Sequence, residues 1–120
     1  MELMPKGKIK FTKEDRAWAT SVKERDGFAC VICNKKQGTP YISNKGRQVK
    51  INIHAHHILP RELHGTKYDI FNGITLCPKH HFFSREISAH NNPLAFFIWM
   101  EINRPEILQY LKEKCHENHT

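Results

Sequence analysis

Apolar side chains spaced three and four residues apart predict helices at both ends of the chain. The first helix begins after Thr12, a residue type that caps helix N-termini, and acidic residues follow in its first turn. Trp18 and Val22 lie four positions apart and form the apolar stripe of this helix. Asp26-Gly27 ends it, because glycine adopts a positive φ without steric cost.

Two breaks near the C-terminus separate two further helices. Residues 91–93 end in proline and precede a helix whose apolar positions include Leu94 and Ile98. Residues 103–105 form the second break, and Pro105 suits the first turn of a last helix. The apolar positions of that last helix are Ile107, Leu108, Leu111 and Cys115. We expect the larger aromatic side chains to be core residues rather than platforms for base stacking, namely Trp18, Phe82, Phe83, Phe96, Phe97 and Trp99.

Alternating polar and apolar positions predict a strand near the middle of the chain. Over residues 49–56 apolar side chains alternate with polar ones, which is typical of a strand with one buried face. Pro60 ends this strand, because the residue before a proline is held away from helical geometry. The preceding residues, 38–46, form a polar loop.

A second strand and a helix follow after an irregular connection over residues 61–71. Residues 73–76 predict a short strand, and Pro78 suits the first turn of a helix over residues 77–87. Helices at both ends and short strands between them indicate an α+β fold.

The distribution of charge adds a binding preference to this picture. The chain has 120 residues, enough for one small domain with a modest core, and a formal net charge of +7. Residues 1–50 carry 12 lysines and arginines against five acidic residues, whereas residues 51–120 carry seven against seven. A basic half attracts polyanions, of which nucleic acid is the most common, although a solvated basic face explains the charge equally well.

Membrane and secretory segments are not predicted. The longest apolar stretch, residues 94–100, is too short to span a bilayer. The first ten residues lack the apolar core of a secretory signal, so we expect a cytoplasmic protein. In a reducing compartment, four cysteines are expected to be metal ligands or buried thiols rather than disulfides.

Two pairs of residues have the types and the spacing of a zinc site. Cys30 and Cys33 form a Cys-x-x-Cys turn that directs two thiolates at one point. Cys77 and His80 lie three residues apart on the predicted helix and share one face of it. We predict a structural Cys3His zinc site that adds folding energy to a small core, the alternative being two unrelated pairs of buried residues.

Three motifs between and beside these pairs carry a family resemblance. The chain reads H-H-I-L-P from His56, N-G-I-T-L-C from Asn72 and P-K-H-H up to His81. Over residues 25–87 it resembles the HNH endonucleases, the ββα-metal nucleases, in which a metal ligand precedes the general-base histidine and an asparagine leads to L-C-x-x-C-H. His80 stands where zinc-bearing members often have a fourth cysteine, and histidine is also an acceptable zinc ligand.

This resemblance implies an architecture for the chain. We expect a zinc-stabilised ββα-metal, treble-clef-like core with one N-terminal helix and further C-terminal helices. A single HNH endonuclease domain would then span residues 1–120. Its parts would be a basic arm over residues 1–11, a zinc knuckle and ββα core over residues 12–88, and C-terminal helices over residues 89–120.

The resemblance also implies a role for each residue of the catalytic site. His57 is the general base that takes a proton from water, a task for which neutral histidine is suited near pH 7. His56 and His81 bind one catalytic divalent cation, and Asn72 orients His57 or the loop that presents it. Imidazole suits Zn, Ni and Co whereas Mg²⁺ prefers oxygen, so Mg²⁺, Mn²⁺ and other transition metals all remain candidates.

Strand alternation limits how these side chains are arranged. It places His56 and His57 on opposite faces, which fits one ligand and one base but also permits the reverse assignment. Arg85 lies four residues after His81 on the predicted helix and is a candidate phosphate contact. The full set of candidate DNA contacts is Arg47, Lys50, His54, Lys67 and Arg85, with His64 as a further candidate. His90 is expected to be a helix-boundary residue rather than a ligand.

Three hypotheses about function follow. The leading one is a metal-dependent endonuclease that hydrolyses phosphodiester bonds of double-stranded DNA, by nicking or by double-strand cutting, and leaves a 5′ phosphate. A stand-alone domain of this length fits a phage or mobile element, in which case it would act in the host cell cytoplasm. The second hypothesis is a zinc-stabilised nucleic-acid-binding module without catalytic activity. The third is an adaptor for phage terminase or packaging proteins, which would present an apolar patch on its C-terminal helices.

Overall fold

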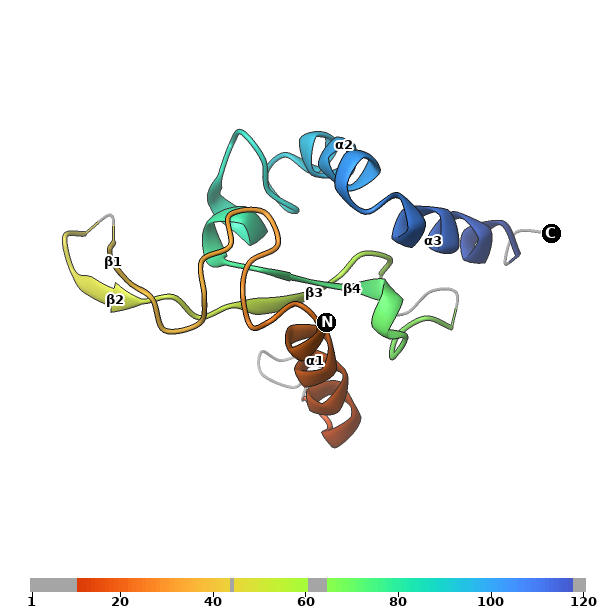
Figure 1. The fold of residues 1–120 in the computed structure, drawn as a ribbon, viewed down its shortest axis with the longest axis horizontal. Helices are drawn as coiled ribbons and strands as arrows, with labels where there is room; N and C mark the ends of the chain where they lie inside the picture. The colour runs from red at the N-terminus through yellow and green to blue at the C-terminus, as the bar shows by residue number, and fades with distance from the viewer. Residues whose placement is uncertain (1–10, 44, 61–64, 118–120) are drawn as a thin grey trace, which may run out of the picture.

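The structure, a computed structural model, describes residues 11–43, 45–60 and 65–117 of the chain (Figure 1). Its elements are α1 (Lys13–Arg25), β1 (Pro40–Ile42), β2 (Gln48–Lys50), β3 (His54–His57), a 3-10 helix η1 (Ile70–Asn72), β4 (Gly73–Leu76), a π-helical turn η2 (Lys79–Phe83), α2 (Pro93–Asn103) and α3 (Pro105–Glu117). Of the predicted basic arm over residues 1–11, all but Phe11 lie outside the described residues. None of the helices described is long and apolar enough to cross a membrane.

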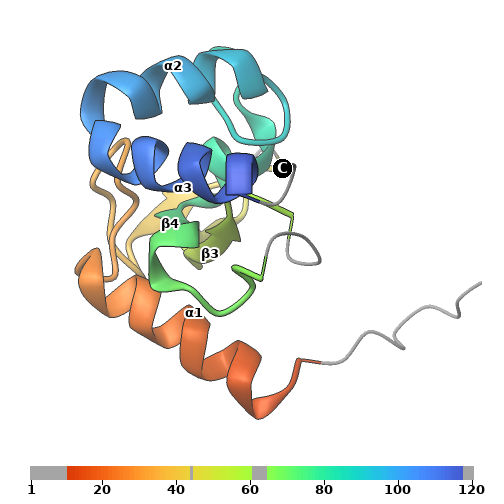
Figure 2. The same cartoon turned by 90° about the vertical axis from the view of Figure 1, so that its right-hand side faces the viewer.

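The antiparallel pair β3–β4 lies at the centre, between α1 on one side and α2 with α3 on the other (Figure 2). All four residues of β4 are buried, because both faces of the strand are covered. Gly73 and Thr75 face α1, where the Thr75 hydroxyl donates to the Val22 carbonyl. Ile74 and Leu76 belong to the apolar core on the other face. Together with η2, the two strands form a ββα unit, and the predicted α+β class is confirmed.

Helix α1 begins and ends as its sequence predicts. The Thr12 hydroxyl accepts from the Asp15 backbone N–H at 3.1 Å, and the Asp15 carboxylate accepts from the Thr12 backbone N–H at 2.9 Å. This capping box satisfies two backbone donors that the first helical turn leaves unpaired. Gly27 follows the helix with a φ of +70°.

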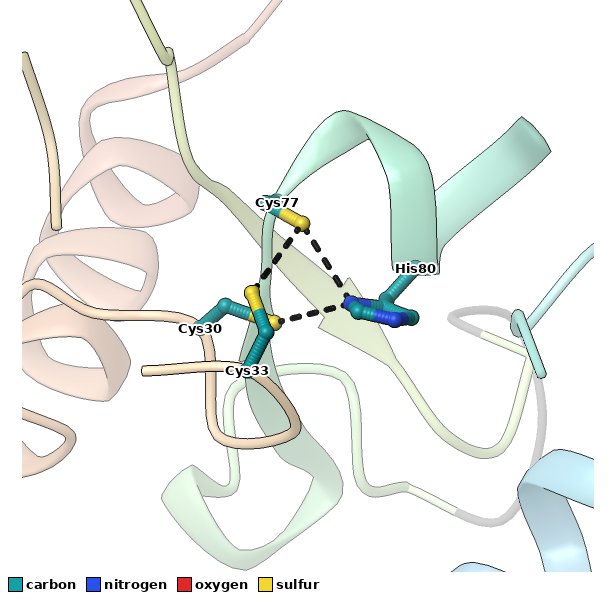
Figure 3. A group of neighbouring side chains, drawn as sticks. All are labelled: Cys30, Cys33, Cys77 and His80. Carbon is teal, nitrogen blue, oxygen red and sulfur yellow. Dashed lines mark hydrogen bonds between the residues drawn. The ribbon is translucent and has the colours of Figure 1, made fainter. Parts of the chain in front are cut away.

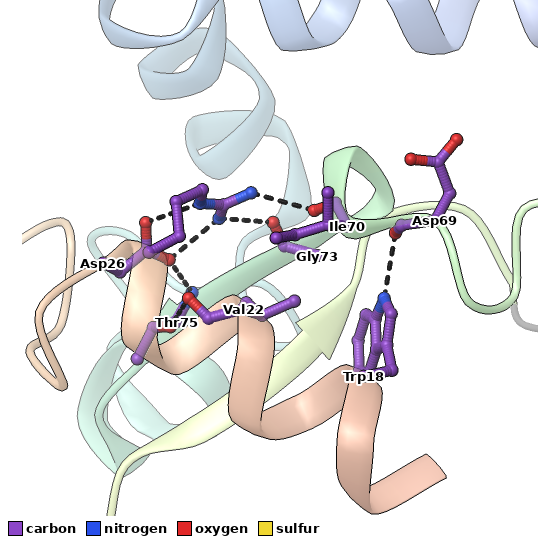
Figure 4. A network of polar contacts seen from close by, with 8 residues as sticks. Trp18, Val22, Asp26, Asp69, Ile70, Gly73 and Thr75 are labelled. Carbon is purple, nitrogen blue, oxygen red and sulfur yellow. Dashed lines mark hydrogen bonds and ion pairs between the residues drawn. The ribbon is translucent and has the colours of Figure 1, made fainter. Parts of the chain in front are cut away.

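Polar bonds hold α1 on β4 (Figure 4). The Arg25 guanidinium donates to the carbonyls of Ile70 and Gly73, at 2.8 Å each, and forms an ion pair with Asp26. The Asp26 carboxylate in turn accepts from the Thr75 backbone N–H at 3.0 Å. These contacts fix the position of α1 relative to β4. They therefore also fix where the buried side chains of α1 lie against β3 and β4.

Gly73 is required where α1 crosses β4. A Cβ atom there would lie 2.5 Å from Val22 Cγ2 and 2.6 Å from Trp18 Cζ2. Gly73→Ala is therefore expected to lower the free energy of unfolding by about 1–3 kcal/mol, the usual cost of overpacking. Urea denaturation of this variant beside Glu101→Ala, an exposed position of α2, measures the effect. Equal stability of the two variants would contradict the close packing.

The predicted strand over residues 49–56 is divided in the structure. β2 pairs with β1, which lies in the predicted polar loop, whereas β3 pairs with β4. Between them the backbone changes partners, because Ile51 N–H donates to the Thr39 carbonyl and Ile53 N–H to the Gln37 side chain. The predicted buried face is nevertheless present, since Ile51 and Ile53 are buried core residues.

The predicted helix over residues 77–87 is wrong beyond its first turn. The Ser84 backbone N–H donates to the Lys79 carbonyl at 2.8 Å, which is the wider spacing of a π-helix, and Ser84 itself is extended. Its hydroxyl accepts from the backbone N–H groups of Glu86 and Ile87, at 3.1 Å each. Serine thus supplies an alternative to helical hydrogen bonds and ends the element.

The expectation that the aromatic residues are core residues holds for only part of the set. Trp18 and Phe96 are buried, at 6% and 7% exposed. Phe82, Phe83 and Phe97 are 41%, 69% and 40% exposed, so the prediction is wrong for these three. Phe82 and Phe83 follow directly on the histidines of η2, and the early end of the helix leaves them at the surface.

Candidate functional site

Four side chains from three segments converge at one end of the ββα unit (Figure 3). Cys30 and Cys33 come from the turn after α1, Cys77 from the end of β4 and His80 from η2. Their sulfur and nitrogen atoms all lie within 4.8 Å of one another. The turn is closed by Asn34, which has a φ of +66° and donates its N–H to the Cys30 carbonyl at 2.7 Å.

The spacing of these atoms fits a tetrahedral zinc ion. With zinc bonds of about 2.3 Å to sulfur and about 2.0–2.1 Å to nitrogen, tetrahedral ligands lie about 3.8 Å apart between sulfurs and about 3.6 Å apart between sulfur and nitrogen. The Cys33 and Cys77 sulfurs are 3.8 Å apart, and His80 Nδ1 lies 3.5 Å from the Cys77 sulfur. The hydrogen bond between Cys30 and Cys77 lowers the pKa of the Cys77 thiol to about 7 and, together with burial, raises that of the Cys30 thiol to about 12, so Cys77 is the more readily deprotonated of the two. The four residues therefore form a cluster that can hold zinc, as the sequence predicts.

A second cluster consists of histidines and lies on the other side of η2. Ring nitrogens of His56, His81 and His90 lie within 4.8 Å of one another. His56 Nδ1 and His81 Nε2 are 3.1 Å apart. Ligands about 2.0–2.1 Å from one ion are separated by about 2.9–3.4 Å in octahedral or tetrahedral coordination, so this pair has the separation that a shared ion requires.

His90 joins this cluster through backbone bonds. The N–H groups of Ala89 and His90 donate to the carbonyls of His80 and His81, at 2.9 and 3.0 Å, and so lay the segment after the Ser84 turn beside η2. The sequence analysis treats His90 as a boundary residue, but its ring reaches the other two and could supply a third ligand. The signal in the sequence was a third histidine downstream of Cys77, but its placement depends on a chain reversal that the predicted helix concealed.

The surroundings of these histidines favour the neutral imidazole, the form that binds metal. Burial is the main cause, and it lowers the pKa of His56 to about 4, with further effects from the charges of His90 and His57. Burial and the neighbouring histidines lower the pKa of His81 to about 3. Burial and the charge of Lys23 also lower the pKa of His54. His56 and His81 are therefore uncharged at neutral pH, before any ion binds.

These lowered pKa values predict how the stability depends on pH. In the unfolded chain His56 takes up a proton below pH 6.5, whereas in the folded protein it does so only near pH 4. The contribution of His56 to the free energy of unfolding is therefore fully present above pH 6.5. It falls between pH 6.5 and pH 4, by up to about 1.4 kcal/mol per pH unit, and His81 acts in the same direction. Urea denaturation of zinc-loaded protein from pH 7.5 to 5, without other metals, measures this slope. An unchanged slope in His56→Asn would contradict the assignment.

His57 faces away from this cluster, as strand alternation predicts. Its ring stacks on Trp18 of α1, with centroids 3.8 Å apart and an interplanar angle of 8°. Its Nε2 lies 2.9 Å from the Lys67 carbonyl, which can only accept, so Nε2 carries the proton of the neutral ring. Trp18 is in turn held by a bond from its indole N–H to the Asp69 carbonyl at 2.9 Å (Figure 4). The basic lone pair of neutral His57 is therefore on Nδ1.

Asn72 is fully buried and holds the loop that follows β3. Its Oδ1 accepts from the Leu59 backbone N–H at 2.6 Å, and its Nδ2 donates to the carbonyls of Leu59 and Thr66, at 3.2 Å each. These bonds join the chain just after His57 to the chain just before Lys67, whose carbonyl contacts His57. Asn72 thus acts on the loop that presents His57, not on the imidazole itself.

The candidate DNA contacts do not share one helix face. Arg47 and Lys50 are exposed on the β1–β2 hairpin, which projects from the β3–β4 core (Figure 1). Arg85 is exposed, but it lies beyond the end of η2, so its expected helical alignment with the histidines is wrong. Lys67 is half-buried beside His57, and His64 lies outside the described residues.

Comparison with known proteins gives one match. Residues 30–83 match the model of a protein family described as HNH endonuclease. No curated protein and no solved structure matches the chain. The matched segment contains the four residues of the cluster that can hold zinc. It also contains His56, His57, Asn72 and His81. Trp18 and His90 lie outside it, in α1 and in the segment after η2.

Proposed function

We propose that this protein, whose residues 30–83 match the model of the HNH endonuclease family, cleaves double-stranded DNA by metal-dependent phosphodiester hydrolysis and leaves a 5′ phosphate. The observation that carries the proposal is the arrangement of histidines at the end of β3. On one side of the strand the imidazole of His56 converges with those of His81 and His90, and on the other side the Nε2 of His57 contacts the Lys67 carbonyl. We further propose that the chain acts as a single domain.

His56, His81 and His90 would hold one divalent cation. Such an ion supplies Lewis-acid stabilisation of charge on the phosphate and on the leaving 3′ oxygen. Three imidazole donors favour a transition-metal ion over Mg²⁺, which prefers oxygen ligands. The low pKa values of His56 and His81 keep both rings in the neutral form that binds the ion.

His57 would act as the general base. The Lys67 carbonyl fixes the proton on Nε2, so Nδ1 accepts the proton of the attacking water. Trp18 stacks on the ring and limits its rotation, while Asn72 holds the loop on which Lys67 lies. Because His56 and His57 leave β3 on opposite faces, a substrate along the strand edge would meet both. The exposed cations Arg47, Lys50 and Arg85 would contact the phosphate backbone.

Incubation of zinc-loaded protein with supercoiled plasmid tests this proposal. We expect nicked or linear product with Mn²⁺, Co²⁺ or Ni²⁺ and none after chelation of the added ion. His81→Ala is expected to abolish the product, whereas His116→Ala, an exposed histidine of α3, leaves it unchanged. Binding to the plasmid without product under every divalent ion would favour the non-catalytic binding module instead.

An adaptor function is a second candidate, and one observation favours it. The outer face of α2 carries four exposed apolar side chains, Leu94, Phe97, Ile98 and Ile102, at 40–73% exposed. An apolar stripe of this kind is typical of a surface that binds another protein, and phage terminase or packaging proteins are the proposed partners. A double variant with serine in place of Leu94 and Ile102 is expected to weaken such a complex and to leave plasmid cleavage unchanged. This result would separate the two functions.

A further inference from the structure

The two ring nitrogens of His81 face two different histidines. Its Nε2 lies 3.1 Å from His56 Nδ1, within the cluster that also contains His90. Its Nδ1 lies 2.8 Å from Nδ1 of His54, which is a short hydrogen-bond distance. His54 is not a member of the three-residue group whose nitrogens converge. His81 therefore stands between a cluster of candidate ligands on one side and His54 on the other.

The chemistry of a neutral imidazole makes these two contacts dependent on each other. A ring nitrogen that binds metal must present its lone pair, so the proton of a neutral ligand histidine is on the other nitrogen. In His81 the proton would be on Nδ1, and it needs an acceptor. Nδ1 of His54 is placed to accept it at 2.8 Å, which leaves the proton of His54 on its own Nε2.

We propose that His54 is a positioning residue that fixes the tautomer and the ring orientation of His81 as a metal ligand. This inference rests on the proposed role of His81 in binding a divalent cation. Partners of this kind are usual for ligand histidines, but they are mostly carboxylates, backbone carbonyls or water. Here another histidine, His54, is the partner of the ligand histidine.

The strand register explains why His54 reaches His81. His54 and His56 are two residues apart on β3, opposite Leu76 and Ile74 of β4, and so they lie on the same face. The rings of both meet His81 edge-on, with centroids 5.0 and 4.9 Å away. One strand thus supplies a candidate ligand and the residue that orients the opposing ligand.

Phe82 packs against the His54 ring. Its ring lies 5.7 Å from that of His54 and 4.0 Å from that of His81, and it stacks on His90 at 5.0 Å with an angle of 20°. An aromatic ring packed against three imidazoles limits the orientations open to each. This packing accounts for an exposed phenylalanine next to a ligand, a placement that the sequence does not predict.

A direct DNA contact was the expectation from the sequence for His54, and the two roles predict different results. A phosphate contact would act on DNA affinity with or without metal. A positioning residue acts on metal affinity, typically by about 10–100-fold when such a partner is removed, and leaves metal-free DNA binding unchanged. The hydrogen bond to His81 favours the second role.

Two substitutions separate the hydrogen bond from the packing. In His54→Asn the amide oxygen takes a place close to that of Nδ1 and can accept the His81 proton, whereas His54→Leu fills similar space without an acceptor. Zinc-loaded proteins would be titrated with Co²⁺ by calorimetry, in the absence of DNA. We expect His54→Leu to weaken Co²⁺ binding by about 10–100-fold and His54→Asn to recover most of it. Equal affinity of His54→Leu and wild type, or equal losses in both variants, would overturn the proposal.

A spectroscopic measurement on the unaltered protein gives an independent test. Long-range proton–nitrogen NMR correlations identify the protonated nitrogen of each imidazole in zinc-loaded, Co²⁺-free protein at pH 7.5. The proposal requires the Nδ1–H tautomer for His81 and the Nε2–H tautomer for His54, and any other pair of tautomers overturns it. Both tests are independent of cleavage, so a lack of nuclease activity would contradict the proposed function and leave this inference open to its own result.

Discussion

Replacement of Cys77 by serine is expected to unfold the protein at 25 °C. Cys77 is one of the four residues at which the turn of Cys30 and Cys33 meets η2. Zinc binding contributes about 10–16 kcal/mol in small zinc-finger peptides, which is as much as the whole stability of an ordinary domain, about 5–15 kcal/mol. A serine hydroxyl does not replace a thiolate in this role. Loss of bound zinc, measured by elemental analysis, together with loss of chemical-shift dispersion, would show the effect.

Cys115→Ser is the matched control. Cys115 is a partly buried thiol of α3 that does not belong to the cluster. This variant is expected to fold and to retain its zinc, so the difference between the two serine variants isolates the ligand from the general cost of removing a thiol. A folded Cys77→Ser variant with an unchanged zinc content would contradict the proposed structural site.

The parts of the fold that the sequence predicts are those fixed by neighbouring residues. The Thr12 cap, the Gly27 end of α1 and the Cys-x-x-Cys turn each depend on a few consecutive residues. The cluster that can hold zinc was predictable for a related reason, because the chemistry of zinc limits which side chains can share an ion, however far apart they lie in the chain. Spacing and ligand chemistry together were sufficient there.

The parts that the sequence does not predict depend on competition between partners. The apolar alternation over residues 49–56 is the same whether the strand is continuous or divided. The strand is divided because the backbone N–H groups of Ile51 and Ile53 donate to residues of the 37–39 segment. The spacing of residues 77–87 fits a helix, but the Ser84 hydroxyl takes up the next backbone donors and ends it.

The candidate site shows the same limit. His90 reaches the cluster only because the chain reverses after Ser84, so a helix prediction hides it. Trp18 has the sequence signature of a core residue and is one, yet its buried ring also forms the surface on which His57 stacks. Hydrophobic periodicity predicts burial, but it does not identify the residue against which a buried ring packs.

Replacement of His57 is expected to abolish cleavage without loss of the divalent ion. A general base typically contributes about 10²–10⁴-fold to the rate, so His57→Gln should lower plasmid cleavage by about that factor. Glutamine keeps a planar polar group beside Trp18 but cannot take up a proton at neutral pH. The affinity for Co²⁺ should stay within about twofold of wild type, because His57 lies on the α1 face of β3 and its Nε2 contacts Lys67.

His56→Gln completes the comparison and decides between the two assignments that strand alternation permits. His56 Nδ1 lies 3.1 Å from His81 Nε2, so its loss should weaken Co²⁺ binding and cleavage together. If the roles were reversed, the loss of metal affinity would follow His57→Gln instead. The geometry favours the first result, because only His56 has its ring among the converging nitrogens, whereas the His57 ring stacks on Trp18 on the other face of the strand. Adjacent residues of one short strand can therefore divide metal binding from proton transfer, since alternation directs their side chains to opposite faces.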